Sequence, residues 1–125
     1  QLKTKITQIH QINSGETVGY NCGWKATKNT RVAVLPIGHA DGFLRQYGHG
    51  NSWVMINGQK AYVVGNVCMD MIMVDIRDIP CCEKSEVVVI GAGARADEIA
   101  KNAGTISYEL LSALGNRITR VLKTK

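Results

Sequence analysis

Apolar and β-branched residues occur along the chain in short runs, and Gly, Asn, Asp or Pro bounds most of these runs. Such runs are typical of β-strands, because branched side chains pack well on a pleated surface. Asn57-Gly58 lies between two of them and favours positive φ at both turn positions, which predicts a tight hairpin. We predict strands over residues 31–37, 52–56, 60–64, 71–76 and 86–91, an early strand over much of residues 3–12, and another over residues 17–20.

Helical signals come late in the sequence. Two short helices are predicted, over residues 98–103 and 108–114, and a last strand over residues 117–122 follows them. Asp97 can cap the first helix and Gly104 can end it. Many short strands with two small helices predict an all-β fold, either a barrel or a sandwich.

The size and composition of the chain suit one folded domain. It has 125 residues, of which 45% are apolar, enough for a hydrophobic core. No apolar run approaches the ~18 residues of a membrane span, and the first residues lack the apolar core of a signal peptide, so we expect a cytoplasmic protein. The net charge of +5 is spread along the chain, which favours an anionic small ligand over nucleic acid.

The cysteines do not follow a metal-binding pattern. Cys81 and Cys82 are adjacent, and no C-x-x-C spacing occurs with Cys22 or Cys68. Free cysteine is among the most frequently buried residue types. We therefore interpret the four cysteines as structural thiols and predict no metal site.

The segment "VGNVCMDMIMVD", residues 64–75, combines sulfur-containing and acidic residues. A soft Cys/Met pair beside a hard carboxylate suits no single metal ion well, so a buried strand is the default interpretation. In an unbroken strand Cys68, Asp70, Ile72 and Val74 would share one face, and Met69, Met71, Met73 and Asp75 the other. Asp70 would then need polar partners or water, which indicates a strand end that opens onto a polar cleft.

Four motifs in this order resemble one known family. They are "VGYN" (18–21), "LPIGHADGF" (35–43), "VVGNVCMDM" (63–71) and "GTISYELL" (104–111). Together they are similar to the C-terminal domain of alanine racemase, a pyridoxal-phosphate enzyme that interconverts L- and D-alanine. The resemblance covers essentially the whole chain, residues 1–125, and implies a β-barrel. It also implies that the N-terminal (β/α)₈ barrel, which carries most of the cofactor site and its lysine, is absent from this chain.

The resemblance implies roles for three residues. Racemisation moves a proton between two faces of the α-carbon, and two acid–base groups do this most simply. Tyr20 would be one such group, and a lysine from the barrel of the other subunit the second, so the enzyme would be a homodimer. The backbone N–H of Met69 would face the carboxylate of the amino acid substrate, and the Tyr108 hydroxyl would contact the cofactor phosphate.

The substrate entrance is where the sequence departs from the family pattern. His39 stands where the family has a tyrosine, and Asn66 stands where an arginine is frequent, whereas Arg45 and Ile106 match. A histidine is shorter than tyrosine and can carry charge near pH 6.5. Asp70 would support the neighbouring loop by accepting hydrogen bonds.

Three alternatives to an alanine racemase follow from these observations. The changed entrance allows a racemase for serine or for a broader range of amino acids. A degenerate family member would bind pyridoxal phosphate for regulation without racemising. A basic β-barrel that binds nucleic acid without catalysis belongs to another class, and the scattered basic residues make it the weaker interpretation.

Overall fold

The computed structural model describes residues 2–18, 24–25, 28–38, 41, 43, 47–48, 50, 52–91, 93–102 and 104. One helix, α1 (Ala96–Asn102), follows the strands within these residues. The strands are β1 (Leu2–Lys5), β2 (Gln8–Ile12), β3 (Thr17–Val18), β4 (Trp24–Lys25), β5 (Thr30–Leu35), β6 (Trp53–Ile56), β7 (Gln59–Val64), β8 (Ile72–Asp75) and β9 (Glu86–Ile90).

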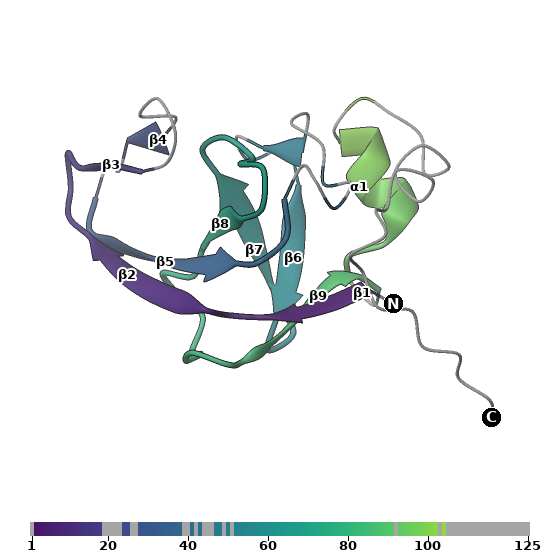
Figure 1. Ribbon diagram of the computed structural model, residues 1–125, viewed down its shortest axis with the longest axis horizontal. Helices are drawn as coiled ribbons and strands as arrows, with labels where there is room; N and C mark the ends of the chain where they lie inside the picture. Colours follow the sequence, from purple (N-terminus) through teal and green to yellow (C-terminus); the bar gives the residue numbers. More distant parts are fainter. Residues whose placement is uncertain are drawn as a thin grey trace.

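Seven of these strands form one curled antiparallel sheet, in the order β1-β9-β6-β7-β8-β5-β2. The strands at the two ends of this order, β1 and β2, are consecutive in the sequence, and Figure 1 shows them as one long, bent stretch below the other strands. The first half of this stretch pairs with β9 and the second half with β5. The sheet therefore closes on itself through the continuous chain, as in a barrel.

The bend between β1 and β2 is hydrogen-bonded on both sides. The Ile6 N–H donates to the Ser85 carbonyl at 3.1 Å, and the Lys84 N–H donates to the Ile6 carbonyl at 2.8 Å. The Thr7 N–H and hydroxyl both donate to the Val34 carbonyl, at 3.0 and 3.1 Å. The Ile6 side chain is 1% exposed and belongs to the hydrophobic core, so its burial also fixes the bend to the core.

The core fills the inside of the curled sheet. Alternate residues of the strands point inward, as the period of two in a strand requires. On β6 to β9 these inward residues are almost completely buried: Val54, Ile56, Ala61, Val63, Ile72, Val74, Val87 and Val89. Each fully buried Val or Ile contributes about 1.5–3 kcal/mol relative to an exposed one, so burial of these branched side chains is what holds the strands together.

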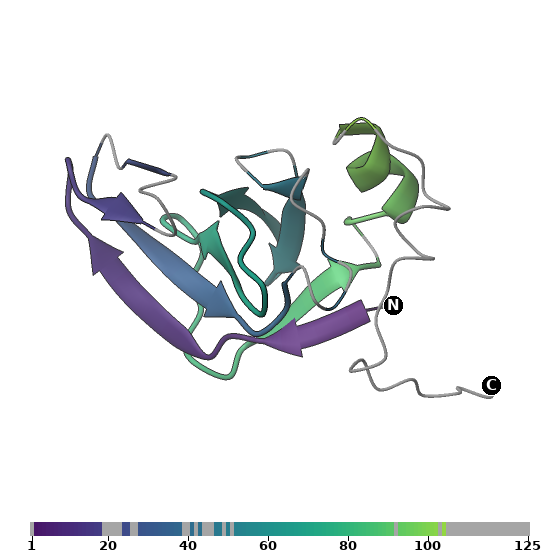
Figure 2. The same ribbon diagram turned by 45° about the horizontal axis from the view of Figure 1, so that its top comes forward.

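The β6–β7 hairpin follows the prediction from the sequence. Asn57 and Gly58 have φ values of 50° and 75°, and Ile56 pairs with Gln59 across the turn. At the start of β6 the buried Trp53 side chain donates from its indole N–H to the Gly93 carbonyl at 2.9 Å. This bond connects the hairpin to the segment that leads into α1. The helix α1 lies at one end of the sheet (Figure 2).

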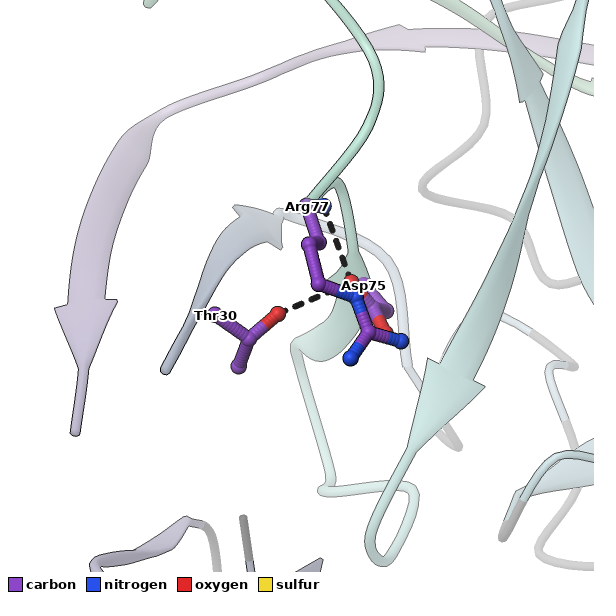
Figure 3. Close-up of polar contacts among 3 residues, drawn as sticks. All are labelled: Thr30, Asp75 and Arg77. Carbon is purple, nitrogen blue, oxygen red and sulfur yellow. Dashed lines mark hydrogen bonds and ion pairs between the residues drawn. The ribbon is translucent and has the colours of Figure 1, made fainter. Parts of the chain in front are cut away.

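A polar cluster joins the end of β8 to the start of β5 (Figure 3). The Thr30 hydroxyl donates to Asp75 Oδ1 at 3.1 Å, and the Arg77 backbone N–H donates to the same oxygen at 2.9 Å. The Arg77 guanidinium donates to Asp75 Oδ2 at 3.2 Å. Because Thr30 is only 3% exposed, Asp75 satisfies a hydroxyl that water does not reach easily.

The all-β class is confirmed, and the closed sheet decides for a barrel over a sandwich. The prediction of a single early strand over residues 3–12 was wrong in one respect, because the bend at Ile6 divides this segment into β1 and β2. The predicted cap was also wrong, since α1 begins at Ala96, and Asp97 lies in its first turn, paired with Arg95 at 3.2 Å. β4 was not predicted. The second predicted helix and the last strand lie outside the described residues, within which no helix is long and apolar enough to cross a membrane.

We predict that Ile6→Ala lowers the free energy of unfolding by about 2–5 kcal/mol, because it leaves a cavity at the closing bend. Ile12→Ala, at the partly exposed end of β2, is the matched control and should cost clearly less. Urea denaturation followed by circular dichroism measures both values. Equal losses for the two variants would contradict the role given to the bend.

We also predict that Asp75→Ala lowers the free energy of unfolding by about 1–3 kcal/mol, because the buried Thr30 hydroxyl loses its acceptor. Asp97→Ala removes an exposed ion pair with Arg95 and should cost less than ~1 kcal/mol. Thermal denaturation of both variants at one ionic strength provides the comparison. A loss at Asp75 no larger than at Asp97 would show that the cluster contributes little.

Candidate functional site

The loop between β7 and β8 carries three of the predicted site residues. Its first residue, Gly65, has a φ of 67°, which turns the chain away from β7. Val67 is buried and holds the loop to the core, whereas Met69 is 65% exposed and Asp70 is also exposed. The Cys68 N–H donates to the Met71 carbonyl at 3.1 Å and closes a tight turn over residues 68–71.

This loop separates β7 from β8, in agreement with the separate strands predicted over residues 60–64 and 71–76, so the condition of an unbroken strand over residues 64–75 is not met. Regular pairing begins only at Ile72. From there the expected alternation holds, with Ile72 and Val74 buried and Met73 and Asp75 partly exposed. Met69 and Asp70 precede the strand and therefore face solvent, so the side chain of Met69 is no part of the core.

Gly38 lies directly against the 68–71 turn. A Cβ atom at this position would lie 2.5 Å from the Cys68 carbonyl oxygen, 2.7 Å from the Met71 nitrogen and 2.8 Å from the Asp70 nitrogen. All three atoms belong to the backbone and have little freedom to move. A glycine at position 38 is therefore needed for the two backbones to pack this closely.

Asp41 makes hydrogen bonds with both backbone polar groups of Gly38. Its carboxylate accepts a hydrogen bond from the Gly38 N–H at 3.1 Å, and its own N–H donates to the Gly38 carbonyl at 2.9 Å. The Phe43 N–H donates to the same carbonyl at 3.1 Å. Asp41 is 3% exposed, and the Phe43 ring packs edge-on against Tyr47 with centroids 5.3 Å apart. The described residues Gly38, Asp41 and Phe43 of the "LPIGHADGF" motif are thus hydrogen-bonded to one another, and Gly38 packs against the 68–71 turn.

Only some of the predicted site residues can be located. Asn66, Met69 and Asp70 all lie on the β7–β8 loop, and Asn66 is partly buried. The segment that ends at Gly38 meets this loop, so two of the four motifs come together there. Tyr20, His39, Arg45, Ile106 and Tyr108 lie outside the described residues.

The supporting carboxylate is the feature that sequence reasoning missed. The expected support came from Asp70, but its side chain is exposed, and none of the hydrogen bonds between described residues involves it. Asp41 is buried and makes the contacts that fix the neighbouring backbone. One sequence signal could have indicated Asp41: aspartate in a turn often accepts hydrogen bonds from nearby backbone N–H groups.

The 68–71 turn also offers a backbone donor. Among the hydrogen bonds between described residues, none uses the Met69 N–H. An N–H group on a rigid, exposed turn can bind an anion, and it does so without the help of the side chain. This arrangement fits recognition of a carboxylate.

The described residues give no sign of metal binding. No three His, Cys, Asp or Glu side chains gather among them. Cys68, Cys81 and Cys82 are free thiols within this part of the chain. Burial raises the pKa of the Cys81 thiol, the nearby Arg31 guanidinium opposes this rise, and Cys82 adds to it. Cys81 packs against the core and thus behaves as a structural thiol.

Comparison with known proteins gives one consistent result. The sequence model of the family described as "Alanine racemase, C-terminal domain" matches residues 1–122. An alanine racemase of Clostridium novyi is 44% identical over 97% of this chain, and an amino-acid racemase of Enterococcus faecalis is 40% identical over 94%. The structure of an alanine racemase from Bartonella henselae with covalently bound pyridoxal phosphate superimposes with a TM-score of 0.90, at 30% identity over 95% of this chain.

The match is confined to part of each of these proteins. The chain spans 33% of the Clostridium novyi enzyme, 17% of the Enterococcus faecalis protein and 33% of the Bartonella henselae structure. Identity and fold nevertheless agree over nearly the whole chain. The chain therefore belongs to the family of alanine racemase C-terminal domains.

Proposed function

We propose that this chain is the C-terminal β domain, residues 1–125, of a pyridoxal-phosphate-dependent alanine racemase. The observation that carries the proposal is the family match over residues 1–122. The enzyme would interconvert L- and D-alanine in the bacterial cytoplasm and supply D-alanine for cell-wall peptides. An N-terminal (β/α)₈ barrel elsewhere in the same protein would hold most of the cofactor, and two subunits would share each site.

In this proposal Tyr20 exchanges the α-proton of the substrate on one face. Pyridoxal phosphate, when bound, supplies the electron sink that makes this proton acidic. A phenol has an unperturbed pKa of about 10, so forming the phenolate at pH 7 costs roughly 4 kcal/mol. Cations or hydrogen-bond donors beside the Tyr20 oxygen must offset this cost. A lysine of the other subunit's barrel exchanges the proton on the opposite face.

The Met69 N–H binds the substrate carboxylate in this proposal. Three observations support this role: the turn is exposed, its amide is unused by other described residues, and its backbone is braced by Gly38. A backbone donor at the end of a sheet holds its direction better than a flexible side chain would. Tyr108 donates from its hydroxyl to the cofactor phosphate.

A second candidate function is a racemase for serine or for a broader range of amino acids. It rests on His39 and Asn66 at the proposed entrance beside Arg45 and Ile106, whereas the relatives named alanine racemase support the first function. A histidine in place of the family's tyrosine gives a wider and more polar entrance. The α-carboxylate contact would be unchanged, because it is made by the backbone.

Nucleic-acid binding is not favoured. Several basic side chains in the described part of the chain pair with carboxylates: Lys3 with Glu86, Arg77 with Asp75 and Arg95 with Asp97. Such pairing lowers the positive potential that a phosphate backbone requires. Purely regulatory binding of pyridoxal phosphate would be indicated by a full-length protein that binds the cofactor and does not racemise.

We predict that Tyr20→Phe in the full-length protein lowers kcat for racemisation by about 10²–10⁴-fold, because one acid–base group is lost. Tyr62→Phe, which removes a hydroxyl from an exposed tyrosine on β7, is the matched control and should keep wild-type activity. Circular dichroism of alanine enantiomers and exchange of the α-proton in D₂O measure the effect. Undiminished exchange in both enantiomers would refute the role of Tyr20.

We also predict that His39→Tyr changes substrate range rather than chemistry. The ratio of kcat/KM for L-serine to that for L-alanine should fall by about tenfold, as expected when a pocket loses room for one polar group. The turnover of L-alanine itself should stay close to that of the wild type. An unchanged serine-to-alanine ratio would show that position 39 does not set substrate range.

A further inference from the structure

We infer that Asp41 is a positioning residue for the Met69 amide. Through Gly38, its buried carboxylate fixes the 68–71 turn in the orientation that substrate binding needs. The inference deepens the proposed function and rests on it. Three connected observations carry it: the register of two strands, the contact at Gly38 and the hydrogen bonds of Asp41.

The first observation is the register between β5 and β8. Leu35 pairs with Ile72 as the last pair of this antiparallel ladder. Regular pairing stops there, because the Ile37 N–H, which would make the next bond to β8, donates instead to the Leu35 carbonyl at 2.9 Å. The same register, carried three residues further, places Gly38 opposite Met69. The two backbones therefore stay adjacent beyond the last ladder bonds, and another interaction must fix their separation.

The second observation is the contact that takes the place of the ladder. The φ of Gly38 is outside the left-handed region, so the backbone conformation does not require glycine there. Glycine is required because a Cβ atom would collide with the turn. Its Cα faces the Cys68 carbonyl and the amides of Asp70 and Met71. Any movement of Gly38 toward the turn would push on the peptide groups on both sides of Met69. The position of Gly38 therefore limits the direction of the Met69 N–H.

The third observation is how Gly38 is itself held. The Asp41 carboxylate and the Asp41 and Phe43 amides bond both polar groups of Gly38, at 3.1, 2.9 and 3.1 Å. A charged acceptor with 3% exposure makes a stronger bond than it would in water, and it is costly to bury unless such bonds are made. Asp41 consequently has one preferred arrangement, which it imposes on Gly38.

Hydrogen exchange in the full-length protein tests the positioning directly. The reporter is the Cys68 amide, which donates to the Met71 carbonyl and should be protected in the wild type. We expect Asp41→Ala and Gly38→Ala each to raise its exchange rate about tenfold. Asp41→Asn should lie between them and the wild type, since its amide oxygen can still accept from Gly38. Amides of β9 should be unchanged.

Steady-state kinetics give the second readout. We expect KM for L-alanine to rise about tenfold in Asp41→Ala and Gly38→Ala with kcat little changed, because the carboxylate contact is made equally in the ground and transition states. Two control variants separate this specific rise in KM from an effect of general destabilisation. Asp78→Asn removes an exposed carboxylate, and Gly58→Ala adds a methyl group in open space at a φ of 75°, at the other end of β7. Both should keep the wild-type KM and Cys68 exchange rate.

The outcomes are distinguishable. Unchanged exchange at Cys68 in both Asp41→Ala and Gly38→Ala overturns the inference, even if the wild type is an active racemase. Raised exchange with an unchanged KM also overturns it, because the turn would then move without affecting substrate binding. A wild type without racemase activity refutes the proposed function instead, and exchange at Cys68 then still decides whether Asp41 holds the turn.

Discussion

The fold depends on the bend at Ile6 and Thr7, where one stretch of chain passes from one side of the barrel to the other. Without this stretch, β9 and β5 would each present an open edge of unpaired N–H and carbonyl groups, which favours association with other chains. Because the first half of the stretch covers β9 and the second half covers β5, both edges are paired by the same segment. The bonds of Ile6 to residues 84–85 and of Thr7 to Val34 fix the point of crossing, and the buried Ile6 side chain ties that point to the core.

This closure determines where a site can form. The β5–β8 ladder is held at one end by the Thr30–Asp75 cluster and stops at the other end at Leu35 and Ile72. Beyond Leu35 and Ile72 the two segments make no further ladder hydrogen bonds, but they continue from the paired strands β5 and β8. Loops on rigid strands are where proteins commonly carry functional groups. Here the contact between Gly38 and the 68–71 turn extends the order of the sheet by a few residues, and the exposed Met69 amide lies at the limit of that order.

Much of this architecture could be predicted from local sequence, and the remainder depends on partners far away in the chain. The strand segments and the Asn57-Gly58 hairpin follow from side-chain preferences that act over a few residues. The break at Ile6 does not, because it results from bonds to residues 84–85. The start of β8 at Ile72 was predicted to within one residue, but the event that ends its ladder with β5, the turn of the Ile37 N–H back to the Leu35 carbonyl, could not be predicted. Local sequence does not distinguish Asp41 from Asp70, because the difference between them is the tertiary burial of Asp41. The roles proposed for Tyr20 and Tyr108 rest on motif resemblance.

The proposed site separates two tasks that the protein must perform. All amino acids share the α-carboxylate, so a backbone amide at Met69, braced by backbone contacts, can bind every possible substrate in the same way. Side-chain selection then rests with residues around the entrance, such as positions 39 and 66, which can change without disturbing that amide. In the proposed site, a histidine or an asparagine there would alter which substrate enters and would leave the backbone contact intact. In this proposal, such a division would let one scaffold serve different substrate ranges, and the chain is 44% identical to a relative named for alanine and 40% identical to one named for amino acids in general.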